Sequence, residues 1–587
     1  MKKIPRLLSG IILSILTICL SSCSLSNSVG TVELKYYDNE DVLIGHNPEL
    51  YYKNDLDFAG ADPTVIYITE GEYEGYFLMY LAKSEAVNVY MSKDMEKWEV
   101  VSVCFTPPIG SWGYTDLWAP SCIYDKDEDK YFLFYSAVNK NQTDGYEETF
   151  YLGMAYSDSP VGPFQPYVGT NGNGTVMDEG TPIFDYELLG KDHPCYKKGS
   201  SYIDAFPFVD PQTGDKYLYM SRTRAVHDTN IIAGIKMKDW RTPDYSTYQE
   251  LTEVNKTTVG GTEYTERFEG APGSSGNAIN EAPNMIYYEG KYYLTFSVCA
   301  TTDPEYSVMQ AIGDTPLGPF TKVQESHGGV VVGTAMDENG APAWDHVLCT
   351  GSHSFVYDGD ELWIVYHQDK NRRSEGATGV GTHGTRGIAI DRVSFVKNDL
   401  GQNVLHCNGP TTSIQPKVSS SVEYKNIINK ANISVSGANK DFVPLLTDNL
   451  IKFRNTDQVS ELEASKKVTI KIKFEDYVKV KSVLVYNSSD YYKAFQNVSE
   501  LNLSFRKEID GKMYTGIAQA QNVQYDLTTY SNKDASYASS TLYMRPGAPM
   551  IFEFEELEVN EITIKIECPK GNEKIALNEI MVLGKEK

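Results

Sequence analysis

Short apolar and aromatic runs recur along the chain between Val65 and Phe395, and helical periodicity is nearly absent there. Five times the runs share one format: a strand, a polar turn that favours a hairpin, and a second, aromatic strand. The five pairs of runs occupy residues 65–68 and 76–80, 122–124 and 131–135, 206–209 and 217–220, 284–288 and 292–296, and 354–357 and 362–366. This repetition predicts an all-β fold, with a five-bladed β-propeller over residues 51–415.

A different pattern begins after the repeats. Runs at 468–474, 480–486 and 561–566 alternate between apolar and polar residues. Such alternation is typical of half-buried antiparallel strands. We therefore expect residues 421–587 to form a β-sandwich.

Two segments of this region resemble the discoidin-like, galactose-binding-like sandwiches: the stretch 577–584 and the pair Asp448-Asn449. The resemblance implies a carbohydrate-binding module, although some domains of this class are only structural. Three aromatic residues are candidates for an exposed sugar platform, and burial in the core is the alternative for them. They are Tyr491, Tyr492 and Phe495.

The N-terminal segment has the features of an export signal. Basic residues precede an apolar run at 7–20, which is too short to cross a membrane comfortably. The run ends in Leu20-Ser-Ser-Cys23, which resembles a bacterial lipobox and implies that Cys23 is acylated. We expect a lipoprotein signal peptide over 1–23, then a linker with the strand that leads into the propeller over 24–50. The protein is then lipid-anchored at the bacterial cell surface or in the periplasm; an ordinary signal peptide cut just before Cys23 is the alternative.

The charge of the chain narrows the choice of partners. A formal net charge of −26 argues against nucleic acid, because the phosphate backbone would repel the protein. It also opposes binding to anionic lipid, so membrane attachment would depend on the acyl chain on Cys23. The 42 tyrosines in an exported, acidic protein favour neutral carbohydrate as the ligand.

A three-residue motif stands directly before each repeat. If the repeats are equivalent, the motifs occupy one structural position where the innermost strands begin, and all five converge at one mouth of the central channel. Two aspartates, a glutamate and a histidine would then share a depression, although like charges oppose each other's ionisation. The motifs are Ala61-Asp62-Pro63, Trp118-Ala119-Pro120, Ile203-Asp204-Ala205, Glu281-Ala282-Pro283 and Gly351-Ser352-His353.

Three converging carboxyl groups suit the hydrolysis of a glycosidic bond. The reaction needs one protonated acid and one ionised base or nucleophile. A third carboxylate nearby keeps the acid protonated by repulsion between like charges. The sequence therefore predicts a glycosidase with Asp62, Asp204 and Glu281 as its acid–base residues.

Each carboxylate has a rival interpretation. Asp62 could cap a turn with Pro63. Asp210 competes with Asp204, but it lies in the hairpin at the far end of the strand. Glu281 competes with three glutamates of a Gly-rich loop that no strand follows, namely Glu263, Glu266 and Glu269.

Several aromatic residues are candidates for substrate binding. Trp112 lies shortly before the second motif, and Trp118 is the first residue of that motif. Phe206 directly follows the third motif. Aromatic faces stack on sugar rings, but the same side chains could equally pack between blades.

Together, the motifs resemble glycoside hydrolase family 43 over roughly Asp62 to Thr412. Later segments fit as well, including Tyr366-His367, the strand 386–391 and the stretch 408–411. Any one of these matches is weak, whereas their order and spacing together are fairly specific.

The resemblance implies an inverting enzyme that acts on plant polysaccharides containing arabinose or xylose. By this resemblance, Asp62 matches the general base and Glu281 the general acid, while Asp204 matches the group that raises the pKa of the acid and orients it. His353 matches a histidine near a water-coordinated calcium ion in the propeller channel; an alternative is that it only bonds a neighbouring blade. Arg386 matches an arginine that contacts sugar hydroxyls.

Two positions depart from the family pattern, because Ala205 and Ala282 stand where Pro and Gly are frequent. The Glu-Ala-Pro form favours the arabinose-releasing members. We predict an extracellular α-L-arabinofuranosidase or β-xylosidase that acts on oligo- or polysaccharide. The alternatives are an endo-arabinanase and a non-catalytic, carbohydrate-binding propeller, although binding alone would not require three clustered carboxylates.

Overall fold

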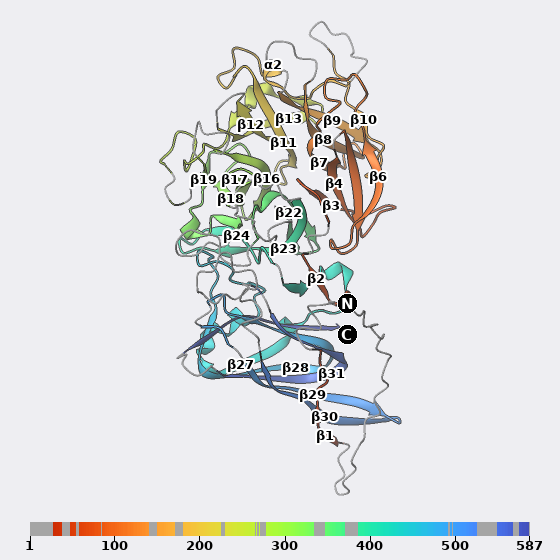
Figure 1. The fold of residues 1–587 in the computed structure, drawn as a ribbon, viewed down its shortest axis with the longest axis vertical. Helices are drawn as coiled ribbons and strands as arrows, with labels where there is room; N and C mark the ends of the chain where they lie inside the picture. Colours follow the sequence, from red (N-terminus) through yellow and green to blue (C-terminus); the bar gives the residue numbers. More distant parts are fainter. Residues whose placement is uncertain are drawn as a thin grey trace, which may run out of the picture.

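The protein, seen in a computed structural model, consists almost entirely of β-strands (Figure 1). Among the residues described, the helical elements are short, with at most seven residues, and no helix is long and apolar enough to cross a membrane. These elements are α2 (Tyr186–Leu189), η1 (Tyr245–Thr247), η2 (Glu325–His327), η3 (Ser419–Ser421), η4 (Ile428–Lys430) and η5 (Lys440–Leu446). The structure describes residues 28–37, 47–54, 58–83, 85–139, 149–170, 180–224, 229–263, 266, 269–270, 278–303, 305–333, 347–369, 386–411, 413–490, 493–495, 497–524, 547, 549–567 and 574–585.

Five antiparallel sheets follow one another along the chain, and each begins with one of the predicted hairpins. Every innermost strand contacts the innermost strand of the next sheet, and β21 contacts β3, which closes the ring. The prediction of a five-bladed propeller is confirmed. The blades are β3 (Thr64–Tyr67), β4 (Phe77–Lys83), β5 (Ala86–Ser92) and β6 (Glu99–Phe105); β7 (Trp118–Asp125), β8 (Lys130–Val138), β9 (Phe150–Ser157) and β10 (Gln165–Pro166); β11 (Ser200–Val209), β12 (Lys216–Arg224), β13 (Ile231–Asp239), β14 (Thr242–Pro243) and β15 (Gln249–Glu250); β16 (Asn280–Tyr288), β17 (Lys291–Val298), β18 (Ser307–Gly313), β19 (Phe320–Lys322) and β20 (Val330–Val332); and β21 (Gly351–Asp358), β22 (Glu361–Asp369), β23 (Arg386–Lys397) and β24 (Asn403–Cys407).

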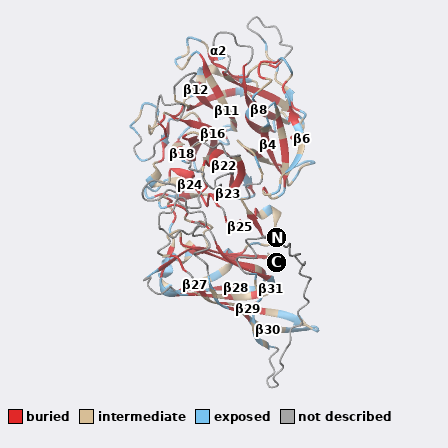
Figure 2. Ribbon diagram, in the orientation of Figure 1, coloured by how far each residue is buried: buried red, intermediate tan, exposed pale blue. Residues whose placement is uncertain are grey.

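Apolar side chains hold neighbouring blades together, and the strands of the propeller are largely buried (Figure 2). One cluster joins Tyr219 of the third blade to Leu294 of the fourth. Another joins Met79 of the first blade to Trp363 of the fifth, across the point where the ring closes. Full burial of a large apolar side chain stabilises a fold by about 1.5–3 kcal/mol, so these contacts hold each blade against the next.

The C-terminal unit is an eight-stranded sheet whose longest strands take part in two layers. Strand β28 (Leu462–Asn487) pairs with β31 (Pro549–Glu567) over 467–473 and again over 478–486, with a register shift between the two stretches. Buried and exposed residues alternate along the first stretch, as the pattern predicts. This arrangement agrees with the predicted sandwich. Its other strands are β26 (Lys425–Asn426), β27 (Ala431–Ala438), β29 (Asn497–Ile509), β30 (Lys512–Gln524) and β32 (Ile575–Lys585).

The N-terminal strand β1 (Ser28–Glu33) belongs to this C-terminal sheet, where it pairs in parallel with β30. The sequence predicts a linker over 24–50 with a strand that leads into the propeller, whereas β1 pairs with the C-terminal sheet. The pairing was missed because β1 has only two apolar residues, Val29 and Val32, which pack against the sandwich core.

The propeller and the sandwich share a packed interface. Strands β2 (Tyr51–Lys53) and β25 (Ile414–Pro416) pair between the two units, and Tyr51 and Ile414 join an apolar cluster with Leu484 of the sandwich. Tyr51 also donates its hydroxyl proton to Ser482, with the two oxygens 2.7 Å apart.

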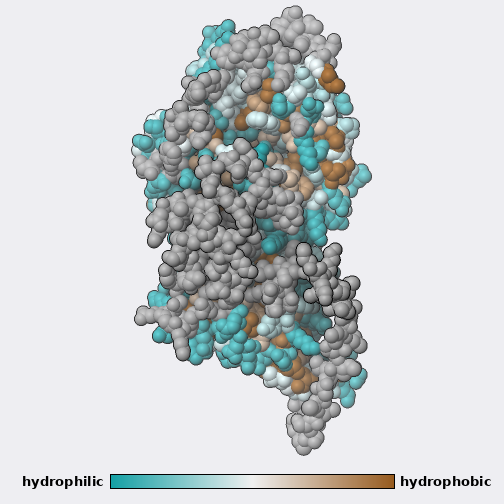
Figure 3. Space-filling view, viewed as in Figure 1, coloured by the Kyte–Doolittle hydropathy of each residue, from teal (hydrophilic) through white to brown (hydrophobic). Residues whose placement is uncertain are grey.

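Hydrophilic residues cover most of the described surface in the space-filling view, and hydrophobic ones lie between them in small groups (Figure 3). The described cysteines are free thiols, and all but Cys195 are buried. They are Cys104, Cys122, Cys195, Cys299, Cys349 and Cys407.

Candidate active site

The five motifs adopt the same backbone conformation. The middle residue of each has a positive φ, which is uncommon for residues other than glycine. In four of the blades the register between the first two strands also shifts at the motif. The motifs therefore occupy one structural position. The φ values are 53° at Asp62, 42° at Ala119, 58° at Asp204, 51° at Ala282 and 46° at Ser352.

The motifs surround a cavity at the centre of the ring. Its walls include Asp62, Asp204, Ala282 and Ser352, which come from four different blades. Unusual backbone conformations of this kind cluster at functional sites, where the surrounding structure holds them in place. The structure thus brings together the residues that the sequence analysis placed at one mouth of the channel.

Asp62 lies beside a cation and a histidine. Its Oδ1 is 3.4 Å from Arg386 Nη1 and 3.4 Å from His367 Nδ1. Burial acts to raise the pKa of Asp62, but the charge of Arg386 and the contact with His367 outweigh it, and the pKa lies well below its usual range. Asp62 is therefore ionised at neutral pH.

Asp204 is tied to the blade that carries Glu281. Its Oδ2 accepts a hydrogen bond from the hydroxyl of Ser221 at 2.9 Å and another from the backbone N–H of Ala282 at 3.0 Å. Burial and the charge of Asp62 raise the pKa of Asp204 to about 6. The bond to Ala282 holds the carboxylate next to the preceding residue, Glu281.

Glu281 is nearly buried, with 9% of its surface exposed, and its Oε1 accepts a hydrogen bond from the hydroxyl of Tyr306 at 2.9 Å. Burial, followed by the charge of Asp204, raises the pKa of Glu281 to about 8. Burial thus contributes more than the charge of Asp204, to which the sequence analysis gave the main role. At neutral pH, the site holds an ionised Asp62 and a largely protonated Glu281, which is the division that acid–base hydrolysis needs.

Three of the four rival carboxylates, Asp210, Glu266 and Glu269, make contacts away from the three clustered carboxylates. Glu269 is fully buried and 2.7 Å from the ammonium group of Lys322. Asp210 is buried in its hairpin and accepts a hydrogen bond from the hydroxyl of Tyr292 at 2.9 Å. Glu266 accepts a hydrogen bond from Ser326 at an exposed position.

The predicted substrate-binding residues differ in exposure. Trp118 is 48% exposed and lies against Phe150, with ring centroids 4.1 Å apart. Phe206 lines the central cavity, and Arg386 lies beside Asp62. Trp112, by contrast, is buried, and its ring packs against the aromatic residues Tyr135 and Tyr151.

His353 also lines the central cavity and is buried. Its Nε2 is 2.7 Å from the hydroxyl oxygen of Thr295, and its Nδ1 has no hydrogen-bond partner. Burial lowers the pKa of His353 to about 3, so the ring is neutral and can offer a lone pair. In the described part of the chain, three or more His, Cys, Asp or Glu side chains do not gather at any metal site.

Elsewhere in the chain, Phe495 is fully buried in the sandwich core, so its prediction as part of an exposed sugar platform is wrong. The other two platform candidates, Tyr491 and Tyr492, lie outside the described residues, as does Cys23.

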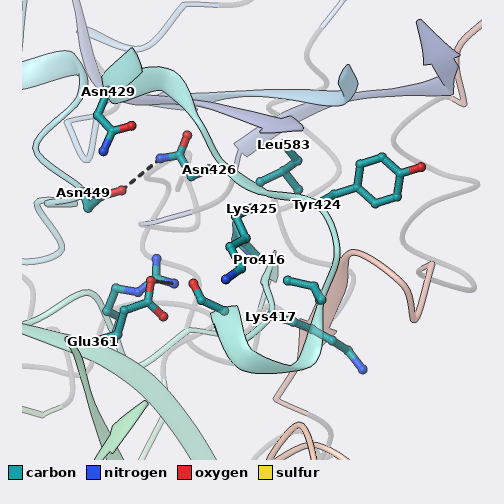
Figure 4. Close-up of a pocket in the computed structure, with 12 residues that line it drawn as sticks. Glu361, Pro416, Lys417, Tyr424, Lys425, Asn426, Asn429, Asn449 and Leu583 are labelled. Carbon is teal, nitrogen blue, oxygen red and sulfur yellow. Dashed lines mark hydrogen bonds and ion pairs between the residues drawn. The ribbon is translucent and has the colours of Figure 1, made fainter. Parts of the chain in front are cut away.

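A cavity of about 190 Å³ lies between the propeller and the sandwich (Figure 4). Asn426 donates a hydrogen bond to Asn449 on its sandwich side, and Glu361 lies on its propeller side, paired with Arg392 at 3.1 Å. Glu361 is the only carboxylate among the described residues that line this cavity, so this cavity lacks the pair of carboxyl groups that a glycosidase needs.

Sequence reasoning missed the residues that support the carboxylates. Ser221 lies in the middle of β12 and has no motif around it. His367 was noted only as part of the family pattern, and its contact with Asp62 depends on the packing of the fifth blade against the first. Tyr306 precedes the third strand of the fourth blade, and no motif around it indicated its contact with Glu281.

A five-bladed propeller whose axis holds one ionised and one protonated carboxyl group defines a glycoside hydrolase. The family model of the glycosyl hydrolases family 43 matches residues 56–400, more than half of the chain. The chain belongs to this family.

Among curated relatives, a β-xylosidase of Xylanibacter ruminicola is 27% identical over 272 residues, which is 44% of this chain and 66% of the relative. The xylosidase/arabinosidase 43A of Humicola insolens is 28% identical over 266 residues, covering 44% of this chain and 67% of its own length. The chain thus spans about two thirds of each relative. A solved thermostable family-43 glycoside hydrolase is 24% identical, with 62% of this chain and 99% of that one covered and a TM-score of 0.44.

Proposed function

We propose that the protein is an extracellular, inverting glycosidase that removes arabinose or xylose units from plant cell-wall polysaccharides. The main support is the difference between the two carboxyl groups, because Arg386 keeps Asp62 ionised while burial keeps Glu281 protonated. The names of the two relatives, a β-xylosidase and a xylosidase/arabinosidase, support the choice of sugar.

In the proposed reaction, Asp62 takes a proton from a water molecule, and that water attacks the anomeric carbon. Glu281 gives its proton to the glycosidic oxygen as the bond to the departing sugar breaks. Asp204 touches neither the water nor the departing oxygen; its charge and its bond to Ala282 act on Glu281. Attack by water in one step inverts the anomeric configuration.

A panel of 4-nitrophenyl glycosides, with linear arabinan and xylan, tests the proposal. Release of single arabinose or xylose units, with inverted configuration by NMR, is the expected result. Release of longer oligosaccharides from arabinan would instead indicate an endo-arabinanase. Binding of oligosaccharide without release from any substrate would indicate a carbohydrate-binding propeller and contradict the proposal.

A calcium ion in the channel is a second proposal. It is supported by His353, whose buried Nδ1 lacks a partner at the wall of the central cavity. Calcium prefers oxygen ligands, so water would supply most of the coordination and His353 would lie at its edge. We expect a chelator to lower the melting temperature and calcium to restore it. An unchanged melting temperature, with no metal found by elemental analysis, would contradict this proposal.

We also propose that the mature protein is anchored to the membrane through a lipid on Cys23. Strand β1 begins at Ser28, shortly after the lipobox, and its pairing with β30 would place the anchor at the sandwich end of the molecule. Labelling with a radioactive fatty acid, compared between the full-length protein and Cys23→Ala, checks this. Equal labelling of the two would argue against it.

A further inference from the structure

Tyr306, which directly precedes β18, contacts Glu281 directly and is linked to Asp62 through His367. Its hydroxyl is fully buried and donates to Oε1 of Glu281 at 2.9 Å. Its ring stacks on His367 with centroids 5.7 Å apart and an angle of 6° between the planes. Because His367 lies 3.4 Å from Oδ1 of Asp62, one stacked pair connects Glu281 with Asp62.

The fifth blade leaves room for this tyrosine. Gly351 occupies the first position of the fifth motif, where the fourth motif has Glu281. A Cβ atom added at Gly351 would lie 2.2 Å from Cε1 of Tyr306, which is too close for any side chain. Gly351 is also paired with His367 across β21 and β22. The glycine therefore lets the ring of Tyr306 cross from the fourth blade and reach His367.

The hydrogen bonds around Tyr306 have a defined direction. Ser297 Oγ accepts the backbone N–H of Ser352 at 2.9 Å, so its own proton is free to bond the oxygen of Tyr306. The proton of Tyr306 then points to Oε1 of Glu281. When Glu281 is protonated, Oε1 acts as the acceptor and the acidic proton resides on Oε2.

We propose that Tyr306 is a positioning residue for Glu281: it directs the acidic proton to Oε2 and, through its stack on His367, fixes the acid relative to Asp62. This inference rests on the proposed roles of Glu281 as acid and Asp62 as base. It adds a residue that touches neither the water nor the sugar and acts through the two carboxyl groups.

The variant Tyr306→Phe tests the proposal, because it removes the hydroxyl and keeps the ring on His367. A donor to the ionised carboxylate favours ionisation, so its loss raises the pKa of Glu281 and moves the alkaline limb of the pH–rate profile up by about one unit. We expect kcat to fall about tenfold on an unactivated oligosaccharide and less than about threefold on the matching 4-nitrophenyl glycoside, with little change in KM.

The matched control is Tyr293→Phe, in the neighbouring strand β17. Its hydroxyl donates to the backbone oxygen of Asn403 at 3.1 Å, away from the carboxylates, so neither limb of the profile should move. If Tyr306→Phe does not fold, Gly351→Ala gives a second test, because the added methyl group must displace the ring of Tyr306. It should show the same dependence on the leaving group.

The inference is overturned if Tyr306→Phe and Gly351→Ala both keep the wild-type alkaline limb and the wild-type ratio between the two substrates. That result leaves the proposed function intact as long as Asp62→Asn and Glu281→Gln abolish activity. If those two variants remain active, the proposed function fails first, and the two failures are therefore distinguishable.

Discussion

The propeller and the sandwich each bury a group of carboxyl side chains, and the two groups behave differently. In the sandwich, burial and the charge of Asp448 raise the pKa of Glu579, and burial raises the pKa of Asp448 to about 6. Both shifts have the same direction. At the propeller axis, the pKa of Asp62 is lowered while the pKa of Glu281 is raised.

The comparison shows that a raised pKa alone does not mark a catalytic acid. Glu579 is fully buried, and its Oε2 accepts the backbone N–H of Asn449 at 3.0 Å, which is a structural contact. Glu281 directly precedes Ala282, which lines the central cavity together with Asp62, and Arg386 stabilises the negative charge of Asp62. An acid and a base held apart in pKa at one cavity are what the chemistry requires.

The largest effect is expected from removing the ionisable groups at the axis. Asp62→Asn and Glu281→Gln should each lower kcat by a factor of about 10² to 10⁴ or more, because each removes one half of the proton transfer. Steady-state kinetics on an unactivated oligosaccharide measures this. If either variant keeps more than about a tenth of the wild-type kcat, the residue that it replaces is not the catalytic base or acid.

Asp204→Asn should have an intermediate effect. It keeps the shape of the side chain but removes a charge that raises the pKa of Glu281. The alkaline limb of the pH–rate profile should therefore move to lower pH, opposite to the shift expected for Tyr306→Phe, while the acid limb moves little. Activated aryl glycosides should suffer less than natural substrates. An alkaline limb that stays in place would show that Asp204 acts only through its hydrogen bonds to Ser221 and Ala282.

The sequence was sufficient to predict the propeller because each blade is one continuous repeat, with its turn and its motif in fixed order. It also indicated Asp62, Asp204 and Glu281, since equivalent positions must converge at the axis. It could not predict that Tyr306 crosses to the fifth blade, because that contact depends on the space left at Gly351. Nor could it assign β1 to the sandwich, since parallel pairing with a distant strand leaves no local pattern.

Exposure was the other property that the sequence left open. Trp112 and Trp118 are close in the chain and alike in type, yet Trp112 is 6% exposed and Trp118 is 48% exposed. Phe495 likewise follows two tyrosines in a polar segment but points into the core. The side-chain type favours a sugar platform in each case, whereas the packing of neighbouring strands decides whether the ring reaches solvent.

The smallest effect on activity is expected from Glu579→Gln, which tests the sandwich side of the comparison. We expect kcat to stay within about twofold of wild type, because Glu579 contacts no part of the propeller axis among the described residues.

The stability of the protein should change instead of its activity. The unfolded chain ionises Glu579 near pH 4.3, whereas burial holds the folded pKa well above that value, so the wild type loses stability as the pH rises through this window. Glutamine does not titrate, so the variant should gain about 1 kcal/mol or more relative to wild type between pH 4 and pH 8. Denaturant unfolding in metal-free buffer at both pH values measures the difference, with the exposed Glu555→Gln as control. If the pH dependence of the two proteins is equal, Glu579 is stabilised as a carboxylate after all; if kcat falls strongly instead, the sandwich contributes to catalysis and the contrast between the two regions is lost.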